Sequence, residues 1–355
     1  MLRHTVRMRL HVGLRCDGGA ELGVGHVIRC LALADELLAR GAAVTLIGDV
    51  GGVVWVEEQV RERGLDHVQA PGDAEGLTAL ATRLRLDAMV LDGYHLDPQC
   101  GTSLRATGVV VLAISDGPFG AEQEADIVLD QNLGATADPA RSGTVLAGLD
   151  FVLFRDQVLT HRRSPESLDC AGSPPRVLTV FGGTDPYAAG PVVVPLLLAT
   201  GLPVHVVAVA ARPEIAEQMR ALPTGSGQTI EVVAPVEDLA ALAVTCDLAV
   251  TAAGSSVWEF LCLGVPAALI CVTDNQAVGY DAVSAEGVAV PVGRLAALRD
   301  DPQARDAGVD ALRRLLDDPA ARQTLAERGQ RLVDGRGRQR VADALAHHQP
   351  DRPRG

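Results

Sequence analysis

The sequence predicts an α/β fold with two Rossmann-like, doubly wound domains that face one another across a cleft. Three observations support this prediction. The chain has 355 residues, which is enough for two domains that each bury a core. It is 48% hydrophobic but only 3% aromatic, so its cores consist mainly of Val, Leu and Ala, as in parallel sheets covered by helices. Short apolar runs also alternate with glycine turns in both halves.

The N-terminal domain is expected over residues 1–160. It opens with an apolar strand at residues 10–14, a glycine-rich turn, and an amphipathic helix at residues 26–40 that Gly41 can end. Four further apolar runs bounded by turn residues extend the sheet, at residues 44–47, 88–91, 109–114 and 127–129. This order of strand, helix and strand predicts a parallel sheet with helices on both faces.

A polar, proline-containing segment at residues 161–176 is expected to link the domains. The C-terminal domain is expected over residues 177–330, and it begins again with a strand and a Gly-Gly turn. Its apolar runs lie at residues 177–181, 205–209, 230–233, 248–251 and 267–271. Residues 331–355 are expected to form a helix and a frayed tail. Ligands of open α/β sheets bind at the carboxyl ends of the strands, so the cleft is the expected site.

The composition argues against several classes of function. A net charge of −14 repels nucleic acid and anionic membrane surfaces, so we expect neither as a stable partner. All 31 basic residues are arginine, which excludes a P-loop lysine and a lysine Schiff base. The 7 cysteines are scattered without a C-x-x-C pair, and we expect no signal peptide and no transmembrane segment. The expected protein is cytoplasmic, without disulfides or a zinc site.

The first candidate motif is Gly23-Val24-Gly25-His26, at the turn from the first strand into the first helix. A dinucleotide-binding fingerprint would need a third glycine where Ile28 stands, which argues against a dehydrogenase. The turn offers free backbone N–H groups, and Arg29 follows one turn into the helix. The helix N-terminus disfavours the cation of His26, so this side chain is either a neutral general base or a structural, capping histidine.

Polar residues also follow other strands of this half. Asp17 follows the first strand, Asp92-Gly93-Tyr94-His95 follows the strand at residues 88–91, and Asp116 follows the next strand. The carboxyl ends of parallel strands lie at one edge of a sheet, so these side chains are expected to face the cleft. In the alternative interpretation, Asp92 and Asp116 cap the helices that follow them.

The C-terminal half carries residues suited to a nucleoside diphosphate, each just after an apolar strand. Amides of glycine turns can hold phosphate oxygens without a basic side chain, and a carboxylate can accept two hydrogen bonds from a ribose diol. Glycine turns are also common as plain connections. The candidate phosphate-binding residues are Gly182, Gly183, Thr184, Gly254, Ser255 and Ser256. Glu259 is the candidate ribose ligand, and Asn275 and Gln276 can reach the same pocket.

The motifs of the C-terminal half resemble, in their order, the nucleotide domain of the glycosyltransferase-B fold, as in the transferase that makes lipid II. The full set resembles one family, the UDP-sugar hydrolases of pseudaminic acid biosynthesis and the related spore-coat polysaccharide proteins. The motifs that carry this resemblance are Arg15-Cys16-Asp17, Gly23-Val24-Gly25-His26, Arg29-Cys30, Asp92-Gly93-Tyr94 and residues 126–132, 181–186 and 334–337. The resemblance extends from about residue 9 to residue 345.

The resemblance implies an enzyme that releases UDP from a 2,4-diacetamido-2,4,6-trideoxyhexose, a UDP-linked amino sugar, by water attack at the anomeric carbon with inversion. It implies His26 as the catalytic base, with Asp17 and Tyr94 on the sugar side. It also implies that Glu259 and the turn at residues 254–256 bind the UDP, with Asn275 near the sugar or the phosphate. Members of this family need no metal and no organic cofactor, so none is expected.

This chain departs from the pattern of the family at two places, and two other functions stay open. Ser115-Asp116 stands where the family usually has two Asp residues, and Gly19 replaces a small polar residue. A glycosyltransferase would pass the sugar from UDP to an acceptor hydroxyl rather than to water. A binding protein without activity would retain the glycine turns, but the displayed His26 would then have no purpose. The sequence leaves the identity of the sugar and the oligomeric state open.

Overall fold

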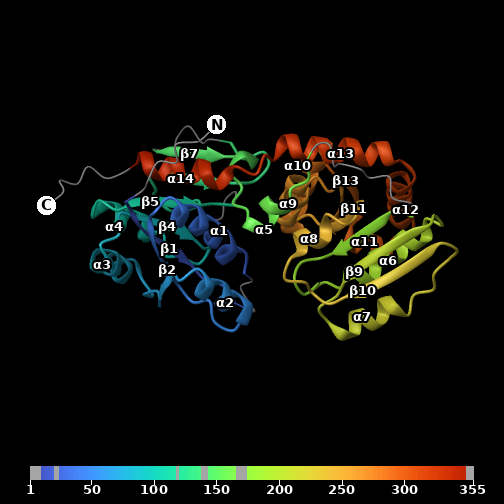
Figure 1. The fold of residues 1–355 in the computed structure, drawn as a ribbon, viewed down its shortest axis with the longest axis horizontal. Coiled ribbons are helices and arrows are strands. Elements are labelled where there is room, and N and C mark those ends of the chain that lie inside the picture. The colour runs from blue at the N-terminus through green and yellow to red at the C-terminus, as the bar shows by residue number, and fades with distance from the viewer. Residues whose placement is uncertain (1–8, 20–23, 117–119, 137–142, 165–173, 349–355) are drawn as a thin grey trace. The chain divides into compact units, whose positions relative to one another are not determined.

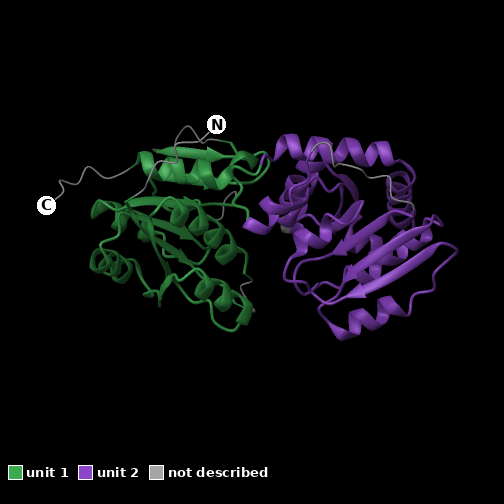
Figure 2. Ribbon diagram, in the orientation of Figure 1, with its two compact units in different colours: residues 1–155, 335–355 green, residues 156–334 purple. Residues whose placement is uncertain are grey.

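The computed structural model describes residues 9–19, 24–116, 120–136, 143–164 and 174–348. The chain divides into two compact units, one of residues 1–155 with 335–355 (unit 1) and one of residues 156–334 (unit 2), as Figure 2 shows. Each unit is a parallel β-sheet flanked by helices (Figure 1). The predicted fold class of two Rossmann-like α/β domains is therefore confirmed.

Unit 1 contains a seven-stranded parallel sheet in the order β3-β2-β1-β4-β5-β6-β7. The strands are β1 (His11–Cys16), β2 (Ala43–Ile47), β3 (Asp66–Val68), β4 (Ala88–Asp92), β5 (Val110–Ile114), β6 (Ile127–Asp130) and β7 (Thr144–Ala147). The strand order reverses at β1, where Val12 pairs with Val44 of β2 and with Ala88 of β4. In doubly wound sheets, ligands bind beyond the carboxyl ends of the strands at this reversal.

Two apolar cores cover the two faces of this sheet. The helices of unit 1 are α1 (Gly25–Ala39), α2 (Val54–Glu62), α3 (Ala74–Leu84), α4 (Gln99–Ala106), the 3-10 helix η1 (Leu149–Phe151) and α14 (Gly337–His347). Helices α1, α2 and α14 share one core with Leu14 and Leu112 of the sheet. Helices α3 and α4 share the other core with Met89 and Val111. Strands β4 and β5 are buried along their whole length, which explains their continuous apolar sequences.

The C-terminal helix α14 belongs to unit 1, although unit 2 precedes it in the sequence. It packs on α1 and η1, where Arg40 donates a hydrogen bond of 2.5 Å to Asp343. A Cβ on Gly337 would lie 2.2 Å from the carbonyl oxygen of Val152, so only glycine permits this close approach.

The chain therefore passes between the units twice, at 155/156 and at 334/335. The sequence led us to expect one linker at residues 161–176 and a separate C-terminal helix and tail. Helix α5 (Asp156–His161) already belongs to unit 2, and residues 165–173 of the expected linker lie outside the described residues. An amphipathic pattern predicts a helix but does not identify the surface that buries it, so the docking of α14 on unit 1 could not be read from the sequence.

Unit 2 contains a six-stranded parallel sheet in the order β10-β9-β8-β11-β12-β13. Its strands are β8 (Arg176–Val180), β9 (Val204–Val209), β10 (Gln228–Val233), β11 (Leu248–Ala252), β12 (Ala267–Cys271) and β13 (Val290–Arg294). Its remaining helices are α6 (Gly190–Ala199), α7 (Pro213–Arg220), α8 (Leu239–Ala243), α9 (Ser256–Leu263), η3 (Asp274–Gln276), α10 (Ala277–Ala285), α11 (Leu295–Asp300), α12 (Pro302–Asp317) and α13 (Pro319–Leu332). Helices α6, α7, α11 and α12 share one core with the sheet, and α9 and α10 pack against β11 and β12.

Among the residues that the structure describes, none of the helices combines the length and the apolar character needed to cross a bilayer.

Candidate active site

The N-terminus of α1 brings His26 to the carboxyl edge of the unit 1 sheet. Asp92 is the last residue of β4, which pairs with β1 so that Cys16 lies beside Asp92. The chain leaves β1 at Cys16 and enters α1 at Gly25, so the first turn of α1 lies over the end of β4. The Nδ1 atom of His26 is 2.7 Å from Oδ1 of Asp92. Gly25 is exposed at the start of the helix, whereas Gly23 lies outside the described residues.

Asp92 is fully buried and bonds to three side chains of α1. Arg29 donates to both of its oxygens, from Nε at 2.7 Å and from Nη2 at 2.6 Å, and Cys30 Sγ lies 3.6 Å away. Burial alone would raise the pKa of Asp92, but Arg29 and His26 outweigh burial and hold the pKa below its usual value. The carboxylate charge of Asp92 raises the pKa of Arg29 in the same way, against burial. This pair is therefore charged at neutral pH.

The charge on Asp92 determines which nitrogen of His26 carries the proton. An ionised carboxylate can only accept hydrogen bonds, so Nδ1 of His26 must carry the hydrogen that it shares with Asp92. The Nη2 atom of Arg29 is 3.1 Å from the same Nδ1, but it cannot donate to a nitrogen that already holds a proton. The lone pair of the neutral imidazole is therefore on Nε2. In the part of the chain that the structure describes, Nε2 makes no hydrogen bond.

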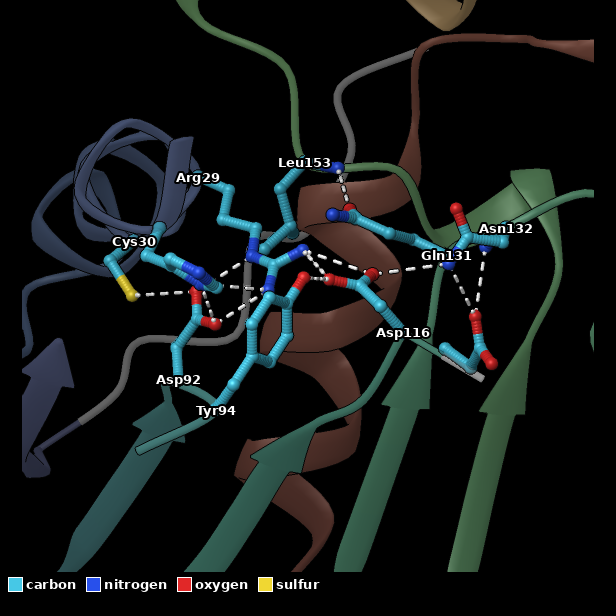
Figure 3. Close-up of polar contacts among 10 residues, drawn as sticks. Arg29, Cys30, Asp92, Tyr94, Asp116, Gln131, Asn132 and Leu153 are labelled. Atoms are coloured by element: carbon cyan, nitrogen blue, oxygen red, sulfur yellow. Dashed lines mark hydrogen bonds and ion pairs between the residues drawn. The ribbon is translucent and has the colours of Figure 1, made fainter. Parts of the chain in front are cut away.

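Asp116, just beyond β5, is the second carboxylate of this cluster (Figure 3). It accepts from Nη1 of Arg29 at 3.1 and 3.2 Å, from the amide of Asn132 at 3.1 Å, and from the hydroxyl of Tyr94. Burial and the charge of Asp116 raise the pKa of the Tyr94 phenol. The Tyr94 ring packs against His26 with centroids 4.7 Å apart and planes 82° apart. The predicted residues His26, Arg29, Tyr94 and Asp116 thus form one bonded group.

Asp17 belongs to a second group on the same sheet edge. It accepts from the backbone N–H of Asp49 at 2.7 Å, lies 2.8 Å from Arg15, and lies 2.6 Å from Nε2 of His95. Burial opposes its charge, but these three donors hold its pKa below the usual value. A cavity of about 530 Å³ adjoins the group, with Arg15, Asp17, Asp49, Asp73, His95 and Asp97 in its lining. The neighbours Tyr94 and His95 therefore belong to different groups, since Tyr94 bonds to Asp116 and His95 bonds to Asp17.

The Asp17 group depends on close packing between β1 and β2. A Cβ on Gly48 would lie 1.8 Å from the carbonyl oxygen of Cys16, so only glycine lets the chain after β2 pass the end of β1. This passage brings the N–H of Asp49 to Asp17. The expectation that Asp17 lies on the sugar side together with Tyr94 stays a prediction.

In unit 2, the first predicted turn follows β8. Gly182, Gly183 and Thr184 are exposed, and Gly182 has a φ of +73°. The turn is fixed by Asp185, which is buried and accepts from the N–H groups of Ala189 at 2.8 Å and Gly190 at 2.9 Å. The charge of Asp185 thus stabilises the start of α6, while the three residues before it remain accessible.

The second predicted turn follows β11, the neighbour of β8 in the sheet. The Thr251 hydroxyl donates to the carbonyl of Val180 at 2.8 Å, which ties the ends of the two strands together. Beyond Thr251, Gly254 and Ser255 lead into α9, where Ser256 begins the helix and Glu259 is half-buried in its first turn. The two turns thus follow adjacent strands of the sheet.

Gln276 is partly committed to the protein, because its Oε1 accepts from the N–H of Val272 at 3.0 Å. Its Nε2 lies beside the second turn, 3.8 Å from the position that a Cβ on Gly254 would take. Asn275 is part of η3, but its side chain lies outside the described residues. Gln276 thus lies near the second turn, and its expected role in the pocket stays a prediction.

Two residues of the unit 1 group were not assigned from the sequence. From the sequence, Asp92 could either cap a helix or face the cleft, and Asn132 stood out only as part of the motif at residues 126–132. The signal for Asp92 is its place as the last residue of a buried strand next to β1, which puts a polar side chain at the strand reversal. Among the described residues, no group of three or more His, Cys, Asp or Glu side chains has the geometry to hold a metal ion.

Comparison with known protein sequences gives one distant relative. No family model matches the chain. The uncharacterised protein MJ1062 of Methanocaldococcus jannaschii is 20% identical over 281 residues, which are 77% of this chain and 58% of that protein. The chain therefore spans less than two thirds of the length of the curated relative that it matches.

Solved structures match nearly the whole chain. MurG from Acinetobacter baumannii has a TM-score of 0.73 at 17% identity, covering 95% of this chain and 99% of that chain. A UDP-GlcNAc 2-epimerase from Neisseria meningitidis bound to UDP-GlcNAc has a TM-score of 0.66 at 13% identity, covering 95% and 100%. The glycotransferase of kitacinnamycin has a TM-score of 0.63 at 18% identity, covering 96% and 99%. These likenesses show the fold, and the glycosyltransferase-B architecture expected from the sequence is thereby confirmed.

Proposed function

We propose that this protein is an enzyme that hydrolyses a UDP-sugar to UDP and the free sugar. The proposed substrate is a UDP-linked 2,4-diacetamido-2,4,6-trideoxyhexose, and the proposed pathway is nonulosonic (pseudaminic) acid or surface polysaccharide biosynthesis. The sequence motifs support this through their resemblance to the UDP-sugar hydrolases. A structural neighbour bound to UDP-GlcNAc supports a UDP-sugar as the ligand. The observation that carries the proposal is the His26–Asp92 pair, which leaves a lone pair on Nε2 at the sheet edge.

The chemical step needs one proton acceptor and one leaving group. A water oxygen attacks the anomeric carbon, and its proton passes to Nε2 of His26. The bond from the anomeric carbon to the diphosphate oxygen breaks, and its electron pair leaves with UDP. A single displacement inverts the anomeric configuration. Asp92, buried and ionised, stabilises the imidazolium that forms. Positioned proton transfer of this kind accelerates a reaction about 10² to 10⁴-fold.

The nucleotide is assigned to unit 2. The exposed turn at residues 182–184 and the partly exposed turn at residues 254–256 offer backbone amides, which can bind phosphate oxygens in a protein whose net charge repels anions. Glu259, in the first turn of α9, is the proposed ligand of the ribose diol. The charge that develops on departing UDP is then stabilised by the same amides. The sugar is assigned to the side of Tyr94, a residue that is 48% exposed and whose ring packs against His26.

The proposal is tested with a panel of UDP-amino sugars in H₂¹⁸O, with products followed by mass spectrometry and anomeric NMR. Attack of water at the anomeric carbon puts one ¹⁸O into the sugar and none into UDP. The first anomer detected is the inverted one. Incorporation of ¹⁸O into UDP would mean cleavage at phosphorus, which the proposed role of His26 does not explain.

A glycosyltransferase is the second candidate, because one structural neighbour is a glycotransferase. The same assay separates the two functions. A hydrolase releases free sugar without any added acceptor, whereas a transferase releases UDP only when an acceptor hydroxyl is supplied. An epimerase, such as the neighbour from Neisseria meningitidis, would instead give an isomerised UDP-sugar.

A further inference from the structure

His26 has two neighbours that restrict it in different ways. Asp92 holds one atom, Nδ1, at 2.7 Å. A hydrogen bond at one atom restrains that atom but leaves the imidazole some freedom of rotation about its side-chain torsions, of which χ2 is broad in histidine. The Tyr94 ring stands 82° to the imidazole plane with centroids 4.7 Å apart, and this edge-to-face packing limits such rotation. The direction of the Nε2 lone pair thus depends on where the Tyr94 ring is held.

Tyr94 lies in the loop after β4, and the residue is 48% exposed. Exposed side chains change rotamers readily, so the ring needs an anchor to keep its place. Its hydroxyl donates to Oδ2 of Asp116, the carboxylate just beyond β5 (Figure 3). This bond joins the tip of the phenol to the next strand of the sheet.

Asp116 is itself fully engaged. Its two oxygens receive four hydrogen bonds, two from Nη1 of Arg29, one from Asn132 and one from Tyr94. A carboxylate has about four lone-pair sites, so these protein donors occupy the sites that a substrate would otherwise use. Asp116 is therefore better suited to holding other side chains than to contacting a sugar.

We propose that Asp116 is a positioning residue that acts through Tyr94, holding the phenol ring so that it fixes the imidazole plane of His26. This inference rests on the proposed function for its kinetic consequences, but not for its structural ones. It replaces the sequence-based expectation that Asp116 binds the substrate directly. In the competing explanation, Asp116 acts on His26 through Arg29 and Asp92, since Arg29 bonds to both carboxylates.

A double-mutant cycle on turnover separates the two paths. Tyr94→Phe removes only the hydroxyl, and Asp116→Ala removes its acceptor. If Asp116 acts through Tyr94, each variant lowers kcat by about tenfold, within the roughly 100-fold that a misplacement of about 1 Å can cost. The double variant then falls by the same factor of about ten, because both changes break one contact. Effects that multiply to about 100-fold in the double variant would overturn the proposal.

Two further kinetic results are expected. KM stays within about twofold in both single variants, because orientation of the base rather than binding is lost. Asp116→Asn keeps an oxygen that can accept from Tyr94, so it retains more kcat than Asp116→Ala. An Asn variant as slow as the Ala variant would contradict an acceptor role and favour the path through Arg29.

A spectroscopic arm tests the same proposal without turnover. In ¹⁵N-histidine-labelled protein, the His26 signals should show the Nδ1-protonated form in the parent chain. Tyr94→Phe and Asp116→Ala should each keep that form, because Asp92 is intact, but should broaden or shift the ring signals. The matched control is Asp35→Ala, which removes a partly buried carboxylate that bonds to Arg63 at 2.7 and 3.0 Å elsewhere in unit 1. If both test variants leave His26 as the control does, the proposal is wrong, whether or not any UDP-sugar is turned over.

Discussion

The candidate groups of unit 1 and unit 2 hold their residues in opposite ways. In unit 1, charged and polar side chains from α1 and from beyond β4, β5 and β6 bond to one another, with the buried Asp92 and its partner Arg29 at the centre. In unit 2, the turn after β8 is exposed and the turn after β11 is partly exposed. The buried side chains of Asp185 and Thr251 fix the backbone beside these turns. The comparison indicates that unit 1 depends on particular side chains, whereas unit 2 depends mainly on backbone geometry. This difference fits the proposed function, in which the base His26 must be oriented and the diphosphate must receive hydrogen bonds.

The largest expected effect is on the base. His26→Gln should lower turnover of the UDP-sugar by about 10² to 10⁴-fold, because the amide of glutamine is too weak a base to accept the proton that Nε2 takes. Affinity for UDP, measured by titration calorimetry, should stay unchanged, since UDP is assigned to unit 2. The control is His205→Gln on β9, where His205 bonds to Thr229 and Glu231 away from both candidate groups. Equal turnover in the parent and the His26 variant would remove the catalytic proposal.

The next effect is on the stability of unit 1. Asp92→Ala leaves the guanidinium of Arg29 without its main partner, and breaking a buried pair costs about 3 to 5 kcal/mol. The two tryptophans lie one in each unit, Trp55 in α2 and Trp258 in α9. In a Trp258→Phe background, Trp55 fluorescence during urea unfolding therefore reports on unit 1. A loss below about 1 kcal/mol would mean that Asp116 alone can hold Arg29, and the contrast between the units would weaken.

The same contrast explains what the sequence could predict. Strands buried on both faces give continuous apolar runs, so β1, β4 and β11 were visible without a structure. Glycine turns after strands were visible because glycine and small residues mark them in the sequence. The bonds of His26 and Arg29 to Asp92 and Asp116 were not visible, because they join residues that are 63 to 87 positions apart and depend on strand order. Parallel pairing of β1 with β4 is a tertiary choice that no local pattern specifies.

A smaller effect is expected in unit 2 for Glu259, the proposed ligand of the ribose. Glu259→Ala should weaken UDP binding by about 10- to 100-fold, as expected for loss of hydrogen bonds to a charged acceptor. Binding of 2′,3′-dideoxy-UDP should change much less, since that ligand offers no diol. Titration calorimetry of UDP and of 2′,3′-dideoxy-UDP, each with the parent chain and with Glu259→Ala, measures how much affinity each ligand loses. An equal loss for the two ligands would assign Glu259 to the structure of the turn rather than to the ribose.

The smallest effect is the pH dependence of unit 1. The pKa of Asp92 is lowered in the folded protein, so the unfolded chain binds this proton at higher pH than the folded chain does. Stability contributed by the charged form is therefore present above the unfolded pKa of about 3.9, and it is lost as the pH falls through the lower folded pKa. Each pKa unit of difference corresponds to about 1.4 kcal/mol.

The melting temperature of unit 1 can be followed by Trp55 fluorescence in the Trp258→Phe background. Between about pH 6 and pH 3, this temperature should fall less steeply for Asp92→Asn than for the parent chain. Asp17 also has a lowered pKa, so a residual slope should remain in that variant. Parallel curves for the two chains would show that the Asp92 carboxylate contributes no charge-dependent stability, and the view of unit 1 as a group held by charge would fail.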